Sequence, residues 1–405
     1  MSSSPERSNR ERVERLRDAL TEANLDALAC TTPTEALLVS GYWPIIGNAV
    51  AVVTRDGVVV VAAPEDEGDL AERGWADDVV TFRPGSLDQI VSTPDVVCET
   101  MKAVGAKHGL GHARIGYQAG TSSQPSSYAA MFQYGPATAP LLRAAIPGAT
   151  LIAADDLLAR QRCVKTAYEI ERIRGACRIA AMAYDEGRLR LGGSGAKETE
   201  AADLFRGPLK MDGTGLDSIQ RADGYVYCMS GPNSAKAYAA HQRSTARGIE
   251  RGDLLLVHCN SYADGYWTDI TRTYAIETTN DRQRAMLEAV WAARAAALEA
   301  IRPGARAADV DRAARDELTR RRFGREFLHP TGHGVGFAAI DHNACPRLHP
   351  KSDDVLEAGM VFNVEPGIYF ERWGGMRHCD MIALTESGPE VLTPFHTDHD
   401  SFVLT

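Results

Sequence analysis

The sequence lacks the features that mark a membrane protein or a nucleic-acid-binding protein. It has no apolar run approaching the ~18 residues of a membrane span and no dense block of Lys and Arg. Acidic residues outnumber basic ones, 54 against 44, and give a formal net charge of -10. An anionic partner, whether nucleic acid or membrane surface, is therefore not expected. A small molecule or a short peptide is the predicted ligand.

The cysteines of the sequence also lack a recognisable spacing pattern. The 8 cysteines form no CxxC pair and show no regular spacing, and the N-terminal segment is dense in charge. A secretory signal peptide would need an apolar stretch there. We therefore expect a cytoplasmic protein whose cysteines are free thiols, most of them small core residues.

The chain is long enough for two domains, at 405 residues. A helical pattern over residues 12–25 precedes Val-rich runs joined by Arg55, Asp56 and Gly57, which is the signal of a hairpin turn. Neither a low-complexity linker nor a clear internal repeat interrupts the chain. We predict an α/β domain over residues 1–155.

The second part of the chain, residues 156–405, alternates helical and strand-like patterns. Long helical periodicity covers residues 155–191, and a second helix ends before Pro303 and Gly304. Strand-like runs follow one another without the spacing of βαβ units, and they occupy residues 254–260, 266–276, 360–370 and 376–386. This pattern predicts an α+β domain with a mostly antiparallel sheet.

Polar residues, which are energetically costly to bury, interrupt these apolar strands. His258 and Asp269 lie on the two arms of a hairpin whose turn contains Asp264. A buried hydrogen-bonded pair would be the simplest explanation for these two alone. Similar residues occur in the other strand and turn segments, namely His329, His333, Glu365, Arg377, His378, Cys379 and Asp380. Convergence on one site explains all of them together.

Several motifs in order resemble the pita-bread family, which includes methionine aminopeptidase, prolidase, aminopeptidase P and creatinase. They are SGPN followed by His241, then GYWTDITRT, HPTGHGVGF, NVEPGIYF and GGMRHCDMIALTE. Residues 15–42 resemble the N-terminal domain of the creatinase and prolidase branch. The resemblance implies a creatinase-type N-terminal domain, a C-terminal pita-bread domain with a curved, mostly antiparallel sheet, and a homodimer.

In the peptidases of this family Asp, Asp, His, Glu and Glu hold two divalent metals. By this resemblance Asp269, His333 and Glu365 occupy three of the five ligand positions. The other two are changed, because His258 stands in place of the first Asp and Cys379 in place of the last Glu. A standard dinuclear centre is therefore not expected.

The altered site leaves two possibilities for a cofactor. His258, Asp269, His333, Glu365 and Cys379 could together hold a single Zn, Fe or Mn ion. Alternatively the site binds no metal, as in creatinase-like members, whose catalytic Glu would fall on His378 in this sequence. The sequence does not decide between the two.

The resemblance also suggests roles for individual side chains. His241 would move a proton at the scissile bond, and His342 and Arg377 would bind substrate. His333 would orient water or an oxyanion if no metal is present. Glu365 would be a base, and Cys379 is a candidate nucleophile.

The expected function is hydrolysis of a carbon–nitrogen bond in a small non-standard substrate, in the manner of creatinase. One alternative is an X-Pro aminopeptidase or dipeptidase with an altered mononuclear metal site. Others are a non-catalytic peptide-binding homologue and a lyase on the same fold, since a fold does not determine a reaction.

Overall fold

The computed structural model describes residues 5–45, 48–120, 138–238, 243–341 and 344–405. Its contacts divide the chain into an N-terminal unit, Met1–Arg162, and a C-terminal unit, Cys163–Thr405. The sequence placed this boundary after residue 155, and the residues between form helix α7 (Asp155–Cys163). His241 and His342 lie outside the described residues.

The N-terminal unit is an α/β domain built on a mixed sheet with strand order β4-β3-β2-β1-β5-β6. The expected hairpin is confirmed, because β2 and β3 pair antiparallel and Gly57 has φ 92°. The elements of this unit are α1 (Pro5–Glu22), β1 (Ala27–Cys30), α2 (Pro33–Ser40), β2 (Val50–Thr54), β3 (Val59–Pro64), α3 (Gly68–Glu72), β4 (Asp78–Phe82), α4 (Thr93–Lys107), β5 (Arg114–Tyr117), α6 (Thr138–Ala145) and β6 (Thr150–Ala153).

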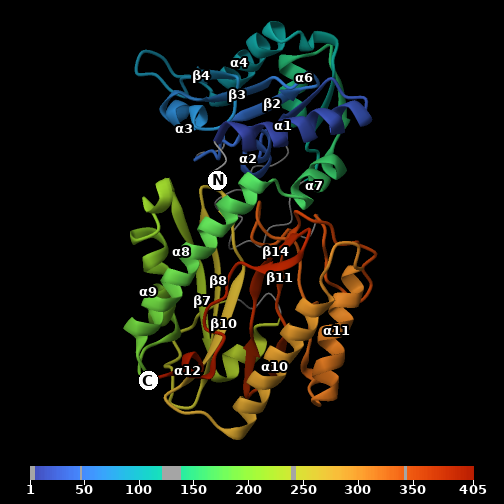
Figure 1. Ribbon diagram of the computed structural model, residues 1–405. Helices are drawn as coiled ribbons and strands as arrows, with labels where there is room; N and C mark the ends of the chain where they lie inside the picture. The colour runs from blue at the N-terminus through green and yellow to red at the C-terminus, as the bar shows by residue number, and fades with distance from the viewer. Residues whose placement is uncertain (1–4, 46–47, 121–137, 239–242, 342–343) are drawn as a thin grey trace. The chain divides into compact units, whose positions relative to one another are not determined.

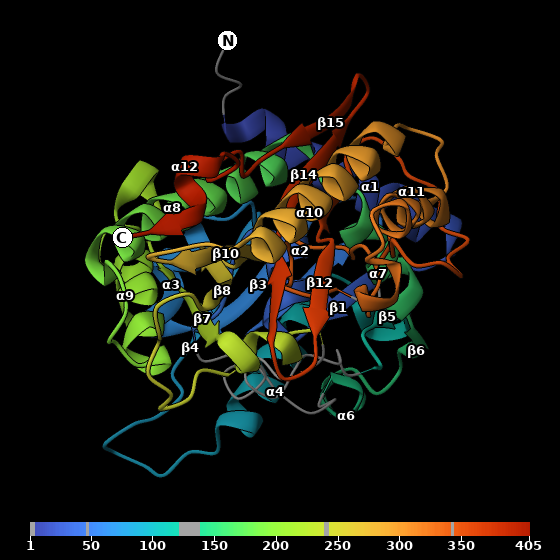
Figure 2. The same cartoon turned by 90° about the horizontal axis from the view of Figure 1, so that it is seen from below.

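The C-terminal unit places its strands between two helix pairs, with α8 and α9 on one side and α10 and α11 on the other (Figure 1, Figure 2). Its elements are α8 (Ala167–Leu191), α9 (Glu198–Met211), β7 (Ala222–Ser230), β8 (Leu254–Ala263), β9 (Tyr266–Trp267), β10 (Ile270–Ile276), α10 (Asp281–Ala300), α11 (Ala307–Arg320), β11 (Val361–Val364), β12 (Gly367–Phe370), β13 (Gly374–Arg377), β14 (Asp380–Thr385), β15 (Gly388–Val391), α12 (His399–Phe402) and β16 (Val403–Leu404).

The strands of this unit pair mostly antiparallel, as the sequence predicted. One sheet has the order β16-β10-β8-β7, and the shorter sheets are β11-β14-β15 and β12-β13. β8 turns into β9 through Asp264 and Gly265, both with positive φ, which gives the tight turn expected between the two hairpin arms. Single bridges pair Thr271 of β10 with Cys379, and Phe362 of β11 with Gly334.

The helical pattern over residues 155–191 forms two helices and not one. Thr166 begins α8 as an N-cap, accepting a hydrogen bond from the backbone N–H of Glu169, whose carboxylate accepts from the Thr166 N–H. This capping box starts a new helix after a short extended segment. The periodicity of the two helices merges in the sequence because only that segment separates them.

The expectation that every cysteine is a free thiol is wrong for one pair. Cys163 and Cys345 form a disulfide between residues 182 positions apart in the chain. The fold brings their Cα atoms to 5.3 Å, within the normal range for a disulfide. Such a long-range approach cannot be read from cysteine spacing. Among the described residues, no helix is long and apolar enough to span a bilayer.

Candidate active site

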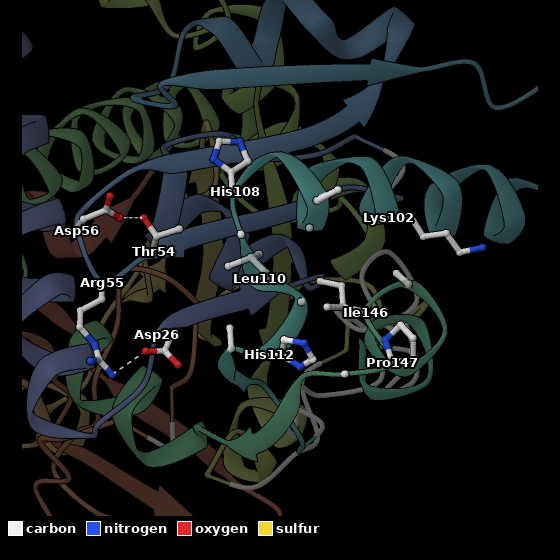
Figure 3. Close-up of a pocket in the computed structure, with 17 residues that line it drawn as sticks. Asp26, Thr54, Arg55, Asp56, Lys102, His108, Leu110, His112, Ile146 and Pro147 are labelled. Atoms are coloured by element: carbon white, nitrogen blue, oxygen red, sulfur yellow. Dashed lines mark hydrogen bonds and ion pairs between the residues drawn. The ribbon is translucent and has the colours of Figure 1, made fainter.

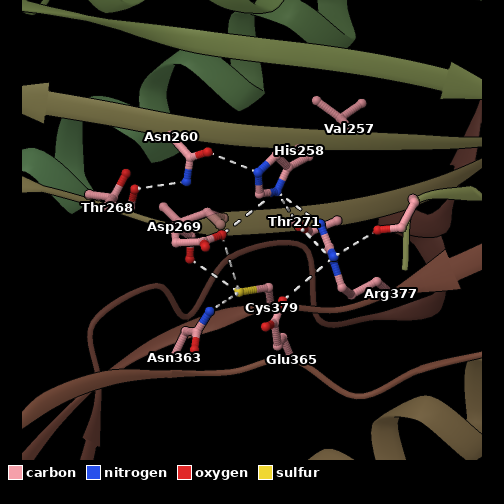
Figure 4. A network of polar contacts seen from close by, with 12 residues as sticks. Val257, His258, Asn260, Thr268, Asp269, Thr271, Asn363, Glu365, Arg377 and Cys379 are labelled. Carbon is pink, nitrogen blue, oxygen red and sulfur yellow. Dashed lines mark hydrogen bonds and ion pairs between the residues drawn. The ribbon is translucent and has the colours of Figure 1, made fainter. Parts of the chain in front are cut away.

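His258 lies on β8 and is held by protein contacts at both ring nitrogens (Figure 4). Its Nε2–H donates to the Asn260 carboxamide oxygen at 2.9 Å. Its Nδ1 accepts from Arg377 Nη2 at 2.9 Å and lies 3.0 Å from the Thr271 hydroxyl. Burial lowers the pKa of His258 to about 4. The ring is therefore neutral near pH 7 and serves as an acceptor for a guanidinium.

Arg377 ends β13 and places a buried positive charge in the cluster. Besides His258, its guanidinium donates to the Thr271 hydroxyl at 3.0 Å and to the Ala237 carbonyl at 3.2 Å. Its Nη1 lies 3.6 Å from a carboxylate oxygen of Glu365. Contacts at all three nitrogens fix the orientation of the guanidinium.

Three more side chains, those of Asp269, His333 and Glu365, come together beside this guanidinium. Asp269 lies in the break between β9 and β10, His333 on the Gly-rich turn, and Glu365 between β11 and β12. His333 Nε2 is 3.3 Å from Asp269 Oδ2 and 3.8 Å from Glu365 Oε1. The predicted convergence of these polar residues is thus present in the structure.

The charges in this cluster stabilise one another. Burial opposes protonation of His333, but the hydrogen bond and charge of Asp269 raise the pKa of the imidazole to about 9. Burial likewise opposes ionisation of Asp269, but the neighbouring histidines and Arg377 lower its pKa to about 2. Burial raises the pKa of Glu365 to about 7. Near pH 7, Glu365 can therefore take up or release a proton.

Cys379 enters the same cluster as a neutral thiol. Its Sγ–H donates to the Asp269 carbonyl oxygen at 3.1 Å, and its sulfur lies 3.6 Å from the Asn363 amide nitrogen. Burial, followed by the charges of Asp269 and Glu365, raises the thiol pKa well above its usual value. Because the thiolate is the reactive form, this environment argues against Cys379 as a nucleophile.

The donor set does not fit the dinuclear centre of the family. His258 has both ring nitrogens in protein hydrogen bonds, one of them to the cationic Arg377. The Cys379 thiol is also hydrogen-bonded within the protein. Across the part of the chain that the structure describes, no group of three or more His, Cys, Asp and Glu side chains is arranged to hold a metal ion.

His378 does not join the cluster that Arg377 and Cys379 enter. Its Nε2 lies 3.3 Å from Asp380, whose carboxylate also binds Arg272 at 2.7 Å and Arg294 at 2.5 Å. Side chains of an extended chain alternate between two faces. His378 and Asp380 therefore point to one side and their two neighbours to the other, so the expected catalytic role of His378 is not supported.

Four site residues were not singled out from the sequence. Asn260 and Thr271 contact His258, Asn363 contacts His333, and the Tyr369 hydroxyl lies 2.8 Å from the Nε2 of His329. A signal for two of them was present, because Asn260 is two residues after His258 and Asn363 two before Glu365. Positions two apart in a strand share a face.

The N-terminal unit contains a separate cavity of about 1100 Å³ (Figure 3). It lies beside the starts of β1 and β5, whereas ligands of open α/β sheets usually bind at the carboxyl ends of strands. Its charged side chains have partners, since Arg55 pairs with Asp26 at 3.1 Å and Lys102 with Glu99 at 2.6 Å. We assign no chemistry to this cavity.

The N-terminal α/β domain and the mostly antiparallel C-terminal domain define a pita-bread hydrolase. Residues 171–386 match the model of metallopeptidase family M24, and residues 12–164 match the creatinase/prolidase N-terminal domain. The chain belongs to metallopeptidase family M24. The predicted family, fold and hydrolase class are thus confirmed.

Proteins named Xaa-Pro dipeptidase or prolidase are similar to this chain over most of its length. The Xaa-Pro dipeptidase of Pyrococcus furiosus is 28% identical over 384 residues, which cover 95% of this chain and 98% of that protein. The crystal structure of the prolidase from Pyrococcus horikoshii has a TM-score of 0.72 at 26% identity, covering 95% of this chain and 98% of that one. The Xaa-Pro dipeptidase from Bacillus anthracis has a TM-score of 0.75 at 25% identity, with the same coverage.

Proposed function

We propose that this protein hydrolyses the carbon–nitrogen bond of a short peptide, with Xaa-Pro dipeptides as the substrate class, at a site that works without the two-metal centre. The proposal rests on one observation. Contacts of 3.3 to 3.8 Å bring together Asp269, His333, Glu365 and Arg377. The similarity to Xaa-Pro dipeptidases supports the substrate class. This similarity favours the Xaa-Pro dipeptidase alternative over the expected creatinase-like reaction.

In this proposal Glu365 acts as the base. Its carboxylate takes a proton from water while the water oxygen bonds to the scissile carbonyl carbon, and it then passes that proton to the departing nitrogen. Arg377 and the positive charge of the His333 ring stabilise the oxyanion that forms on the carbonyl oxygen. Asp269 accepts the Nε2–H of His333 and so keeps that ring charged.

The decisive experiment measures metal content and activity on the same preparation. Purified protein is analysed for bound metals and assayed against a panel of Xaa-Pro dipeptides, with and without a chelator. We expect hydrolysis that the chelator does not abolish, and less than one bound metal per chain. One essential metal would favour the mononuclear alternative, and inertness to the whole panel would exclude the dipeptidase.

A double variant provides the matched control. His258→Asp with Cys379→Glu restores the two carboxylates that the resemblance places at these positions. We expect this variant, unlike the natural chain, to bind two Mn or Co ions per chain in the same metal analysis. If the natural chain already binds two, the proposal fails. The homodimer and the cytoplasmic location stay predictions.

A further inference from the structure

Asp311 and Arg315 form an ion pair one turn apart on α11, outside the catalytic cluster. The Asp311 carboxylate is 1% exposed and accepts from Arg315 Nη2 at 2.9 Å and from Arg315 Nε at 3.0 Å. A buried carboxylate is costly unless opposite charge and hydrogen bonds compensate it. Neither side chain takes part in the proposed mechanism, so the reason for burying this charge must lie in its other contacts.

The Arg315 guanidinium binds the segment that leads into the Gly-rich turn. Its Nε and Nη2 face Asp311. Its Nη1 donates to the Phe327 carbonyl oxygen at 3.1 Å, and Nη2 donates to the His329 carbonyl oxygen at 3.0 Å. The guanidinium also lies over the Phe327 ring, with Cζ 4.3 Å from the ring centroid. Because the group is planar and uses two of its edges, these contacts fix residues 327 and 329 to α11 in one orientation.

The Asp311 carboxylate binds the same segment two residues further on, at the fully buried Thr331. Its Oδ1 accepts from the Thr331 hydroxyl at 2.9 Å and from the Thr331 N–H at 3.0 Å. The Leu348 carbonyl oxygen shares that N–H at 2.9 Å. Two side chains of α11 therefore hold residues 327, 329 and 331 together.

The carbonyl group of Thr331 connects this segment to Glu365. It accepts the backbone N–H of Glu365 at 2.8 Å, and the His333 carbonyl accepts the backbone N–H of Asn363 at 3.1 Å. Residues 331–333 thus pair with residues 363–365 in the manner of antiparallel strands. This pairing determines where His333 lies relative to Glu365.

The paired segments are already as close as their backbones allow. A Cβ at Gly332 would lie 2.0 Å from the backbone oxygen of Asn363. Gly332 is not among the glycines with positive φ, so the glycine is needed here for close approach. If residues 327–331 were released from α11, they could move only away from the strand that leads to Glu365.

We propose that Asp311 and Arg315 are positioning residues for the active site. By fixing residues 327–331 to α11, they maintain the contact of 3.8 Å between His333 Nε2 and Glu365 Oε1. This inference rests on the proposed function, in which these two groups act on the same carbonyl. It gives a role in catalysis to a helix that does not touch the reacting atoms.

Substitution of Thr331 tests the path from α11 to Glu365 with the least disturbance. Thr331→Val removes the hydroxyl that binds Asp311 and keeps the branched shape, whereas Thr331→Ser keeps the hydroxyl. A displaced reacting group slows catalysis. We expect kcat for Xaa-Pro dipeptides to fall by about 10-fold in Thr331→Val and by less than about threefold in Thr331→Ser, with KM changed by less than about threefold in both. An unchanged kcat in Thr331→Val would overturn the proposal.

Two variants change the ion pair itself, and a third on the exposed side of the same helix is the matched control. Asp311→Asn removes the charge, and Arg315→Lys keeps a charge but cannot use two edges. We expect both to lower kcat by about 10- to 100-fold with little change in KM. Arg312→Met breaks only the exposed pair with Asp309 and should keep the natural kcat. If Asp311→Asn raises KM and keeps kcat, the pair affects substrate binding and the proposal is overturned.

A measurement without substrate distinguishes this inference from the proposed function. Backbone hydrogen exchange of the natural chain and of Asp311→Asn is followed by mass spectrometry under conditions where both are folded. We expect faster exchange in residues 327–333 and 363–365 of the variant, and unchanged exchange in β8 and β10 of the same unit.

The pattern of exchange decides the outcome. No change at residues 327–333, or an equal increase throughout the C-terminal unit, would show that the pair does not position this segment, even if the natural chain hydrolyses dipeptides. The expected local increase in a chain that is inert to dipeptides would support the contact to α11 and reject the proposed function alone.

Discussion

At the scale of single residues, contacts within the protein occupy two of the polar side chains in this cluster. Arg377 and Asn260 contact the two ring nitrogens of His258. Cys379 likewise gives its hydrogen to a backbone carbonyl. Positive charge near Glu365 comes from Arg377 and the ring of His333. The cluster thus contains its own counter-charges.

His333, which belongs to this cluster, and His378, which lies beside it, should respond differently to replacement by Asn. We expect His333→Asn to lower kcat/KM by about 10²- to 10³-fold, the range for removing a group that stabilises an oxyanion. His378→Asn should change kcat/KM by less than about threefold, because its ring faces Asp380. Steady-state kinetics of both variants test the contrast, and equal losses would contradict it.

Strand alternation, which separates His378 from Arg377 and Cys379, is a signal that the sequence itself contains. The motif order predicted which segments meet, and the structure brings Asp269, His333 and Glu365 together. Alternation would also have paired His378 with Asp380 on the opposite face. Hydrogen-bond partners such as the Ala237 carbonyl, 140 residues from Arg377, depend on tertiary packing and leave no local signal.

At the scale of elements, Glu198 at the start of α9 joins segments that are distant in sequence. Its carboxylate, 0% exposed, accepts from the backbone N–H and hydroxyl of Ser230, from the Asn233 amide, and from the N–H and hydroxyl of Thr245. The segment between Ser230 and Thr245 includes Ala237, whose carbonyl binds Arg377. A helix end thus supports one contact of the site.

Replacing this carboxylate should destabilise the C-terminal unit. In Glu198→Gln an NH₂ group replaces one carboxylate oxygen. The buried donors that this oxygen served lose their acceptor, so we expect the free energy of unfolding to fall by about 1.5–3 kcal/mol. Asp203→Asn, an exposed change on the same helix, should stay within about 0.5 kcal/mol. Urea unfolding of both variants measures the difference. Equal free energies of unfolding for the two variants would show that the hydrogen bonds to Glu198 make no net contribution to stability.

At the scale of the whole molecule, folding keeps several histidines neutral. Burial lowers the pKa of His258, His378 and His396 to about 4, and that of His329 to about 3. The sequence could not have revealed this, because nothing local distinguishes a histidine that will be buried beside an Arg from an exposed one. The disulfide between Cys163 and Cys345 is hidden in the same way. Both depend on where the folded chain places distant segments.

These depressed pKa values predict how stability depends on pH. The unfolded chain has histidines with pKa near ~6.5, so between pH 6.5 and 4 it binds more protons than the folded chain. The stabilising contribution of these four histidines should therefore be complete above pH 6.5 and fall as pH drops toward 4, by up to about 1.4 kcal/mol per pH unit for each such histidine.

His396 offers the cleanest test of this pH dependence because it lies apart from the catalytic cluster. Its ring contacts the hydroxyl of Tyr274 and the carboxylate of Asp185, each at 2.8 Å. His396→Asn removes the titrating group, so its unfolding free energy should fall less steeply than that of the natural chain between pH 6.5 and 4, even if it is lower at pH 7. Urea titrations across that range, with His112→Asn as the control substitution, measure the slopes. Parallel curves for His396→Asn and the natural chain would show that neutral burial of this ring does not contribute to acid sensitivity.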